Sequence, residues 1–145
     1  MKTNGLTLGG KLIGILFFNI LVGHYFPPTG IFSIPIVISL ATGLIVFNDN
    51  DLTIFQQILL VYGFIALNDI GTKLFAGGIH DWQGLGWIHA MLFASLIPCF
   101  IMLVIGAFRD KTTSVNMKVL SLSLFPLLIY VHLVLFVEVG LVTHD

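Results

Sequence analysis

The sequence predicts an all-α protein, a polytopic integral membrane bundle of five transmembrane helices. Its 145 residues are 57% hydrophobic and only 9% charged, with a mean hydropathy of +1.06. A typical soluble domain carries about 25% charged residues, so these charges are too few to cover a water-exposed surface. Five apolar runs approach the length of about 20 residues that crosses a membrane, and short connections separate them. We therefore expect residues 1–145 to form a single transmembrane helical domain.

The bounds of each span follow from the residues that interrupt the apolar runs. Proline and glycine at positions 27–30 predict a turn after the first run, and the Asn/Asp run at 48–51 predicts a turn after the second. The expected helices are Leu6 or Lys11 to Phe26, Ile31 to Phe47, Leu52 to Phe75, Gly84 to Phe108, and Met117 to Leu141.

The first run is the weakest of the five, because Asn19 and His24 interrupt it. A four-span bundle with this run lying in the membrane interface is therefore the alternative. No small-x-small cleavage site follows the run, so we expect a retained span rather than a secretory signal.

The distribution of Lys and Arg predicts the orientation in the membrane. With five spans, one side carries most of the basic residues, and only Lys73 approaches the other. The basic side comprises Lys2, Lys11, Arg109, Lys111 and Lys118. Because cytoplasmic loops carry an excess of Lys and Arg, we expect a cytoplasmic N-terminus and an extracytoplasmic C-terminus. Trp82 and Trp87 would then lie at the outer interface, where tryptophan is enriched.

Charge and cysteine content limit the classes of partner. The net charge is −1, which gives no basic surface for a nucleic acid. The single cysteine, Cys99, lies within an apolar run and is most simply a small buried hydrophobe. The lipid bilayer is the expected environment. Five short spans enclose little space, so we also expect self-association or association with other membrane subunits.

A chain this apolar nevertheless gathers titratable groups at one level of the membrane. With a rise of about 1.5 Å per residue, the intramembrane acids and histidines all fall in the outer half of the bundle. Such groups are rare in membranes, usually face the interior, and mark ligand or ion pathways. The candidate ligand-binding or ion-binding residues are His24, Asn68, Asp69, Lys73, His80, Asp81, His89, His132 and Glu138.

Several of these residues have a structural interpretation beside the functional one. Asp69 and Lys73 have i,i+4 spacing, so they can form a local ion pair in which Lys73 reaches outward to the interface. Alternatively, Asp69 binds a proton or a cation, and Lys73 adjusts the affinity of Asp69 for it. Glu138 either reaches the headgroup region or joins the outer cluster. Asp81, with His80, either caps a helix end or takes part in acid–base chemistry.

The glycines near the same level also allow two interpretations. The pair at 77–78 and the run Gly84 to Trp87 are either turn elements or parts of a re-entrant loop that holds a ligand.

No motif in the sequence identifies a cofactor. A transition metal held by His80, His89 and His132 is one alternative, although His80 and His89 do not match the spacing of a known zinc motif. A haem clamped by His24, His89 or His132 is disfavoured, because no pair of histidines has a diagnostic spacing.

The leading function is a small membrane protein that binds or conducts an ion, a proton or a small polar solute through the outer cluster, as an oligomer or as a subunit of a larger membrane complex. One alternative is an intramembrane enzyme that acts on a lipid or isoprenoid headgroup at the outer interface. It is less favoured, because no catalytic signature is visible. The other alternative is a structural or assembly subunit without activity of its own.

Overall fold

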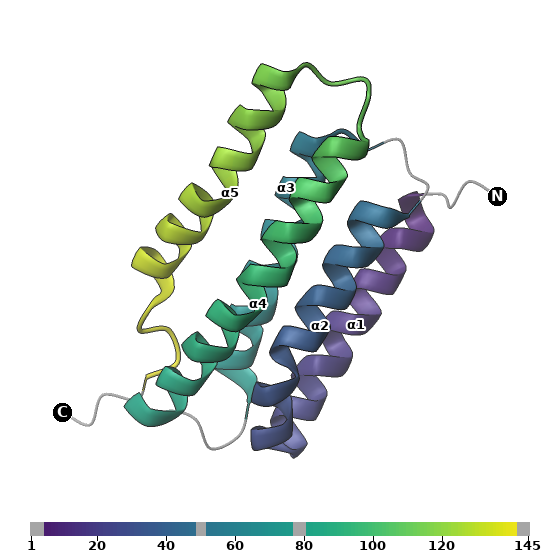
Figure 1. Cartoon of the computed structure of the whole chain (residues 1–145). Helices are drawn as coiled ribbons and strands as arrows, with labels where there is room; N and C mark the ends of the chain where they lie inside the picture. Colours follow the sequence, from purple (N-terminus) through teal and green to yellow (C-terminus); the bar gives the residue numbers. More distant parts are fainter. Residues whose placement is uncertain (1–4, 49–51, 77–80, 142–145) are drawn as a thin grey trace.

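Five long helices form one bundle in the computed structural model, which describes residues 5–48, 52–76 and 81–141 (Figure 1). The helices are α1 (Gly5–Tyr25), α2 (Pro27–Phe47), α3 (Ile54–Phe75), α4 (Trp82–Arg109) and α5 (Val115–Phe136). All five are long and apolar enough to cross a membrane, and the described residues contain no strand. The predicted five-helix fold is confirmed.

Successive helices run in opposite directions, so the bundle has two distinct ends (Figure 1). At the end that we call the Trp82 end, α1, α3 and α5 finish while α2 and α4 begin. The opposite end is the Arg109 end. The start of α1 and the end of α5 consequently lie at opposite ends of the bundle.

Two of the expected helix bounds are wrong. Pro27 and Pro28 form the first turn of α2 instead of a separate turn, and only Phe26 lies between α1 and α2. The first N–H groups of a helix have no partner within the helix, so proline costs little there. Helix α5 ends at Phe136 rather than Leu141, and residues 137–140 form turns.

The connection between α1 and α2 brings two glycines into contact. Gly23 lies in the last turn of α1 and Gly30 in the first turn of α2, and both are buried. A Cβ atom on Gly30 would overlap the backbone of Gly23. Small residues let membrane helices approach this closely, so the α1–α2 contact depends on glycine at this position.

The interior of the bundle is mostly aliphatic. Helix α3 packs against all four other helices and α2 packs against α1, α3 and α4, whereas α5 packs chiefly on α3 and touches α4 only slightly. Isoleucine dominates the buried core, which includes Ile38, Ile45, Ile58, Ile65 and Ile88. Tight aliphatic packing fixes the helix positions, and so holds the few buried polar side chains in place.

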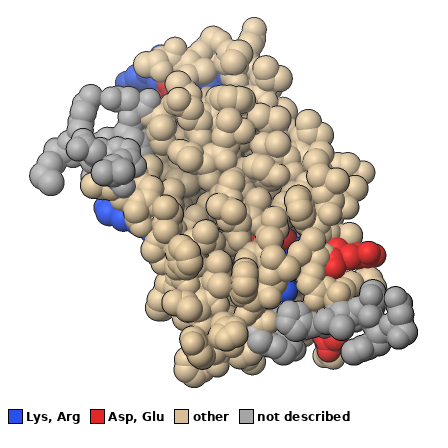
Figure 2. Space-filling view, turned by 180° about the vertical axis from the view of Figure 1, so that it is seen from behind, with Lys and Arg blue, Asp and Glu red and all other residues tan. Residues whose placement is uncertain are grey.

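Charge is segregated between the two ends. Figure 2 shows a broad belt of uncharged side chains, with basic groups towards one end and acidic groups towards the other. Arg109, Lys111 and Lys118 lie at the Arg109 end, whereas Asp81 and Glu138 are exposed at the Trp82 end. The uncharged belt is the surface that a hydrocarbon core would contact.

Asp110 closes the turn that follows α4. Its carboxylate accepts hydrogen bonds from the hydroxyl groups of Thr113 (2.5 Å) and Thr112 (2.7 Å) and from both backbone N–H groups. These bonds, with that from the Thr113 hydroxyl the strongest, hold the pKa of Asp110 well below its ordinary value. The charged carboxylate therefore stabilises the α4–α5 connection.

We predict that the Asp110→Asn substitution removes part of the acid sensitivity of the fold. A carboxyl with a lowered pKa in the folded state stabilises the protein fully above its unfolded pKa of about 3.9, and this contribution is lost as the pH falls through the lower folded pKa. Thermal melting in detergent at decreasing pH measures the effect. Identical pH profiles for the wild type and the variant would contradict it.

Candidate functional site

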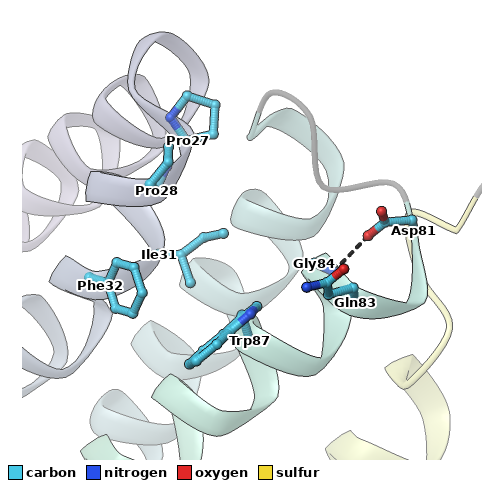
Figure 3. Close-up of a pocket in the computed structure, with 8 residues that line it drawn as sticks. All are labelled: Pro27, Pro28, Ile31, Phe32, Asp81, Gln83, Gly84 and Trp87. Carbon is cyan, nitrogen blue, oxygen red and sulfur yellow. Dashed lines mark hydrogen bonds between the residues drawn. The ribbon is translucent and has the colours of Figure 1, made fainter.

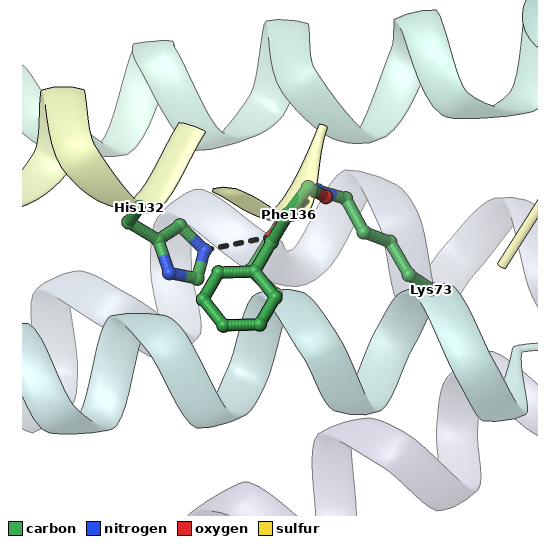
Figure 4. Close-up of polar contacts among 4 residues, drawn as sticks. Lys73, His132 and Phe136 are labelled. Carbon is green, nitrogen blue, oxygen red and sulfur yellow. Dashed lines mark hydrogen bonds and ion pairs between the residues drawn. The ribbon is translucent and has the colours of Figure 1, made fainter. Parts of the chain in front are cut away.

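The site is built around three titratable side chains that lie inside the bundle near its Trp82 end. The Nζ atom of Lys73 lies 2.7 Å from Oδ2 of Asp69, and Nε2 of His132 lies 3.0 Å from the same oxygen. Figure 4 shows Lys73 and His132 with Phe136 between them, and a dashed line that starts at His132. Asp69 and Lys73 are one turn apart on α3, while His132 comes from α5. Each residue is only 1% exposed. An acid, an amine and an imidazole therefore share one buried location.

Lys73 is held by two acceptors. Besides Asp69, its ammonium donates a hydrogen bond of 2.9 Å to the backbone carbonyl of Phe136, the last residue of α5. The last carbonyls of a helix lack partners within the helix and attract positive charge. The expectation that Lys73 reaches outward to the interface is wrong, because both of its acceptors lie inside the bundle.

The chain beyond α5 folds over this ion pair. Gly140 has a φ of 88°, which favours glycine, and a Cβ atom there would collide with the backbone carbonyl of Lys73. The turns at residues 137–140 therefore lie against α3 at Lys73. This close approach explains why α5 ends earlier than its apolar run suggested.

His89 is the fourth member of the cluster. It projects from α4, and the charges of Lys73, Asp69 and His132 all act on it electrostatically. Its Nε2 atom is buried and has no hydrogen-bond partner among the described residues. Three helices, α3, α4 and α5, thus contribute titratable side chains to one region. We call Asp69, Lys73, His89 and His132 the polar cluster.

Unpaired polar atoms concentrate in and beside the polar cluster. Among the residues that the structure describes, seven buried side-chain atoms lack a hydrogen-bond partner, and five of them lie in this region. They are Asn68 Nδ2, Asp69 Oδ1, Thr72 Oγ1, His89 Nε2 and His132 Nδ1. Buried polar groups are normally paired, so this concentration indicates a place for water, a proton or a ligand.

A second polar network joins the polar cluster to α1 and α2. Asn19 donates a hydrogen bond of 2.8 Å to Oδ1 of Asn68, and Ser33 donates one of 2.7 Å to Oδ1 of Asn19. Asn68 is the residue before Asp69. The network therefore fixes the position of α3 relative to α1 and α2.

We predict that Asn19→Leu destabilises the fold by about 1 kcal/mol, since hydrogen bonds between membrane helices average about 0.6 kcal/mol and two are lost. The measurement is unfolding in mixed detergent micelles. Ser123→Ala is the matched control, because the Ser123 hydroxyl bonds only to Val119 of its own helix. Equal stability of the two variants would show that the network contributes nothing.

The remaining candidate residues lie outside the polar cluster or outside the described residues. His24 is exposed, and its Nδ1 atom lies 2.8 Å from the carbonyl of Phe75. Glu138 is exposed beyond the end of α5, so the interpretation that it joins the cluster is wrong. His80 lies in the undescribed segment 77–80, together with the glycine pair. Gly84 to Trp87 is helical, which contradicts a re-entrant loop there.

Asp81 lies at a separate hollow of about 360 Å³ between the starts of α2 and α4 (Figure 3). Its Oδ1 atom accepts a hydrogen bond of 2.6 Å from the backbone N–H of Gly84. Phe32 and Trp87 meet edge to face across the same hollow, with ring centroids 5.7 Å apart. Asp81 therefore caps α4, as the structural interpretation expects.

The described side chains of the polar cluster do not have the arrangement of a transition-metal site. No group of three or more His, Cys, Asp or Glu side chains among the described residues could hold a metal ion. Two of the three proposed ligands, His89 and His132, do lie in one region. The carboxylate beside them, Asp69, is however already paired with the positive charge of Lys73.

One part of the site had no signal in the sequence. The carbonyl of Phe136 completes the environment of Lys73, yet any residue type can offer a carbonyl. The rings of Phe136 and Tyr62 also pack near His132, with centroids 5.0 Å and 6.2 Å away. Their apolar surfaces help to bury the imidazole.

These observations define the class of the protein as a multi-pass helical membrane protein with a buried polar cluster at one end. No protein-family model, curated protein or solved structure matches the chain.

Proposed function

We propose that the protein binds and conducts a proton through the polar cluster, as an oligomer or as a subunit of a larger membrane complex. The observation that carries the proposal is the buried Asp69–Lys73–His132 arrangement with an unpaired nitrogen on His132. Ionisable residues inside a membrane bundle are costly and normally serve a pathway or a proton relay.

The hydrogen bonds support a specific protonation scheme. An ionised carboxylate only accepts hydrogen bonds, so Nε2 of His132 donates to Asp69. In the neutral imidazole, Nδ1 then carries a lone pair that can take up a proton. Asp69 accepts a hydrogen bond from the imidazolium that results, and the same carboxylate oxygen pairs with the Lys73 ammonium. His89 lies nearby as a second group that can receive the proton.

Charge balance favours a proton over a metal cation. Asp69 and Lys73 cancel each other, so the polar cluster is neutral before a proton is added to His132. A metal cation would need Asp69 Oδ2 as a ligand, but the Lys73 ammonium already lies 2.7 Å from that oxygen and would repel the cation. A proton on His132 instead lies on a group already bonded to that carboxylate.

The bundle supplies only part of a pathway. Between the polar cluster and the Arg109 end, the described core is largely aliphatic, with Thr42, Ser95 and Gln57 as isolated polar groups. A complete path across the membrane needs a second copy or another subunit, which supports an oligomer. We place the polar cluster on the extracytoplasmic side, because Arg109, Lys111 and Lys118 occupy the other end.

The test is proton flux into liposomes that contain the purified protein, driven by a potassium diffusion potential and followed with an enclosed pH-sensitive dye. His132→Gln keeps an amide donor for Asp69 but cannot bind a proton. We expect it to lower the flux by about 100-fold, within the range for loss of a positioned acid–base group.

His24→Gln is the matched control, since His24 is exposed and bonds only to a backbone carbonyl. It should retain the flux of the wild type. Flux through the wild type that is no greater than through empty liposomes would overturn conduction by an oligomer of this protein alone, and equal flux through the two variants would overturn the role of His132. The first of these results favours a structural subunit.

A further inference from the structure

A polar hollow of about 370 Å³ lies at the Arg109 end, where α2 and α4 finish and α3 begins. We call it the Arg109 hollow. It is separate from the polar cluster, because Gln57 of the hollow lies in the first turn of α3 while Asp69 and Lys73 lie in its last two turns. The lining residues that matter here are Asn48, Gln57, Gly106, Arg109 and Lys111.

Two amide side chains of the Arg109 hollow have an unpaired buried atom. Gln57 is 7% exposed, and its Nε2 donates a hydrogen bond of 3.1 Å to the Leu52 carbonyl, which leaves Oε1 as a free acceptor. Asn48 Nδ2 is a free donor. Among the described residues, these are the two unpaired buried atoms that lie away from the polar cluster. Buried polar groups are normally paired, so this donor and acceptor indicate a ligand that supplies both partners.

The unpaired oxygen of Gln57 lies at the wall of the hollow. A Cβ atom on Gly106 would stand 3.0 Å from Gln57 Oε1, and Gly106 itself lines the hollow. Glycine at this position therefore leaves the oxygen uncovered on that side.

The charge of the Arg109 hollow favours an anion. Arg109 and Lys111 are exposed, and neither forms an ion pair with another described residue. Asp110 also lines the hollow, but Thr112 and Thr113 already donate hydrogen bonds to its carboxylate. Counted over the described lining residues, two cations and one carboxylate leave one positive charge. The start of α3 adds the partial positive charge of a helix N-terminus.

An apolar surface adjoins this charge. The Arg109 guanidinium lies over the ring of Phe47, 5.4 Å from its centroid. Phe47 also lines an apolar hollow of about 840 Å³ between α2 and α4, together with Leu40 and Met102. Figure 2 shows the same order on a larger scale, with basic groups beyond the end of the uncharged belt. Phosphate beside hydrocarbon is the arrangement that a membrane lipid presents, which favours a lipid over a soluble phosphate.

We propose that the Arg109 hollow binds the head group of an anionic glycerophospholipid that carries a hydroxyl group. Arg109 and Lys111 donate hydrogen bonds to the phosphodiester. The head-group hydroxyl donates to Gln57 Oε1 and accepts from Asn48 Nδ2. The hydroxyl is needed because a phosphodiester has no O–H to offer Gln57. The inference is independent of proton conduction, since no residue of the polar cluster takes part.

The experiment is native mass spectrometry of the full-length protein in detergent, titrated with dioleoyl phosphatidylglycerol. Two control lipids have the same acyl chains: phosphatidylmethanol has the same charge without a hydroxyl, and phosphatidylcholine has no net charge. We expect phosphatidylglycerol to bind about fivefold more tightly than phosphatidylmethanol and at least about tenfold more tightly than phosphatidylcholine. Equal binding of all three lipids would overturn the inference and leave water as the occupant of the hollow.

Arg109→Gln tests the phosphate contact. We expect it to weaken phosphatidylglycerol binding about tenfold, equivalent to about 1.4 kcal/mol. Lys11→Gln is the matched control, because Lys11 is an exposed cation near the start of α1, at the same end of the bundle but outside the hollow. It should retain the affinity of the wild type. Equal losses in the two variants would mean attraction to surface charge in general and would overturn the inference.

Gln57→Leu tests the hydroxyl contact within a single variant. It should abolish the difference between phosphatidylglycerol and phosphatidylmethanol, while both still bind more tightly than phosphatidylcholine. A difference that persists would overturn the assignment of the hydroxyl to Gln57, and the Arg109→Gln comparison stands even if this variant does not fold.

A soluble phosphate is distinguished by competition with glycerol 1-phosphate, which has the same charged group and hydroxyls without acyl chains. We expect it not to displace phosphatidylglycerol at equal concentration. Displacement would overturn the lipid as the ligand. His132→Gln should leave the lipid preference unchanged, so this inference and the proposed proton conduction fail separately.

Discussion

Replacing Asp69 with leucine is expected to destabilise the protein by about 3–5 kcal/mol, because the buried Lys73 ammonium loses its countercharge. Lys73→Met is expected to have a loss of similar size, since it leaves the Asp69 carboxylate buried with only His132 as a partner. These are the largest effects that we expect from single changes in the polar cluster.

The double variant Asp69→Leu/Lys73→Met is the decisive comparison. Replacing both members of a buried ion pair by apolar side chains is often neutral, because the cost of burying the charges is removed with their attraction. We expect the double variant to be more stable than either single variant. The measurement is the free energy of unfolding in mixed micelles. If the double variant loses as much stability as the two single variants added together, Asp69 and Lys73 are not directly coupled.

The same comparison separates function from stability. If the ion pair serves only to hold α3 in place, the double variant should keep whatever activity the wild type shows in liposomes. The proposed proton site requires Asp69 to stabilise the His132 imidazolium, so the double variant should be stable and inactive. A stable variant with unchanged proton flux would assign Asp69 and Lys73 to the fold alone.

The sequence was sufficient for the fold and for the end of the bundle at which the polar groups gather. Hydrocarbon thickness sets the helix length, and the spacing of Asp69 and Lys73 on one helix determines that they meet. The sequence could not show that His132 contacts Asp69, because that contact depends on how α5 is rotated against α3. Nor could it separate His89 from His24, which lie at similar depth but differ in burial and in partners.

The end of α5 illustrates a different limit. An apolar run continues past Phe136, and the first residue that disfavours a helix, Gly140, comes four positions later. It stops where Lys73, from a distant part of the chain, binds the Phe136 carbonyl and Gly140 turns against α3. A tertiary contact therefore decides a local boundary, and the same contact places Glu138 outside the polar cluster.

Gly30→Ala is expected to destabilise the fold by about 1–3 kcal/mol, the range for overpacking a close contact. The new Cβ atom would meet the backbone of Gly23, and backbone cannot move aside as a flexible side chain can. The two helices must separate where only Phe26 connects them. The hydrogen bond from Ser33 to Asn19, close to this contact, should weaken as well.

Gly63→Ala is the matched control, because a Cβ atom there meets nothing within 4 Å. Glycine inside a helix is less favourable than alanine by about 1 kcal/mol, so the control should be at least as stable as the wild type. Unfolding of both variants in mixed micelles gives the comparison. Should Gly30→Ala prove as stable as Gly63→Ala, α1 and α2 do not need the close approach, and α1 can shift without disturbing the network that reaches Asn68.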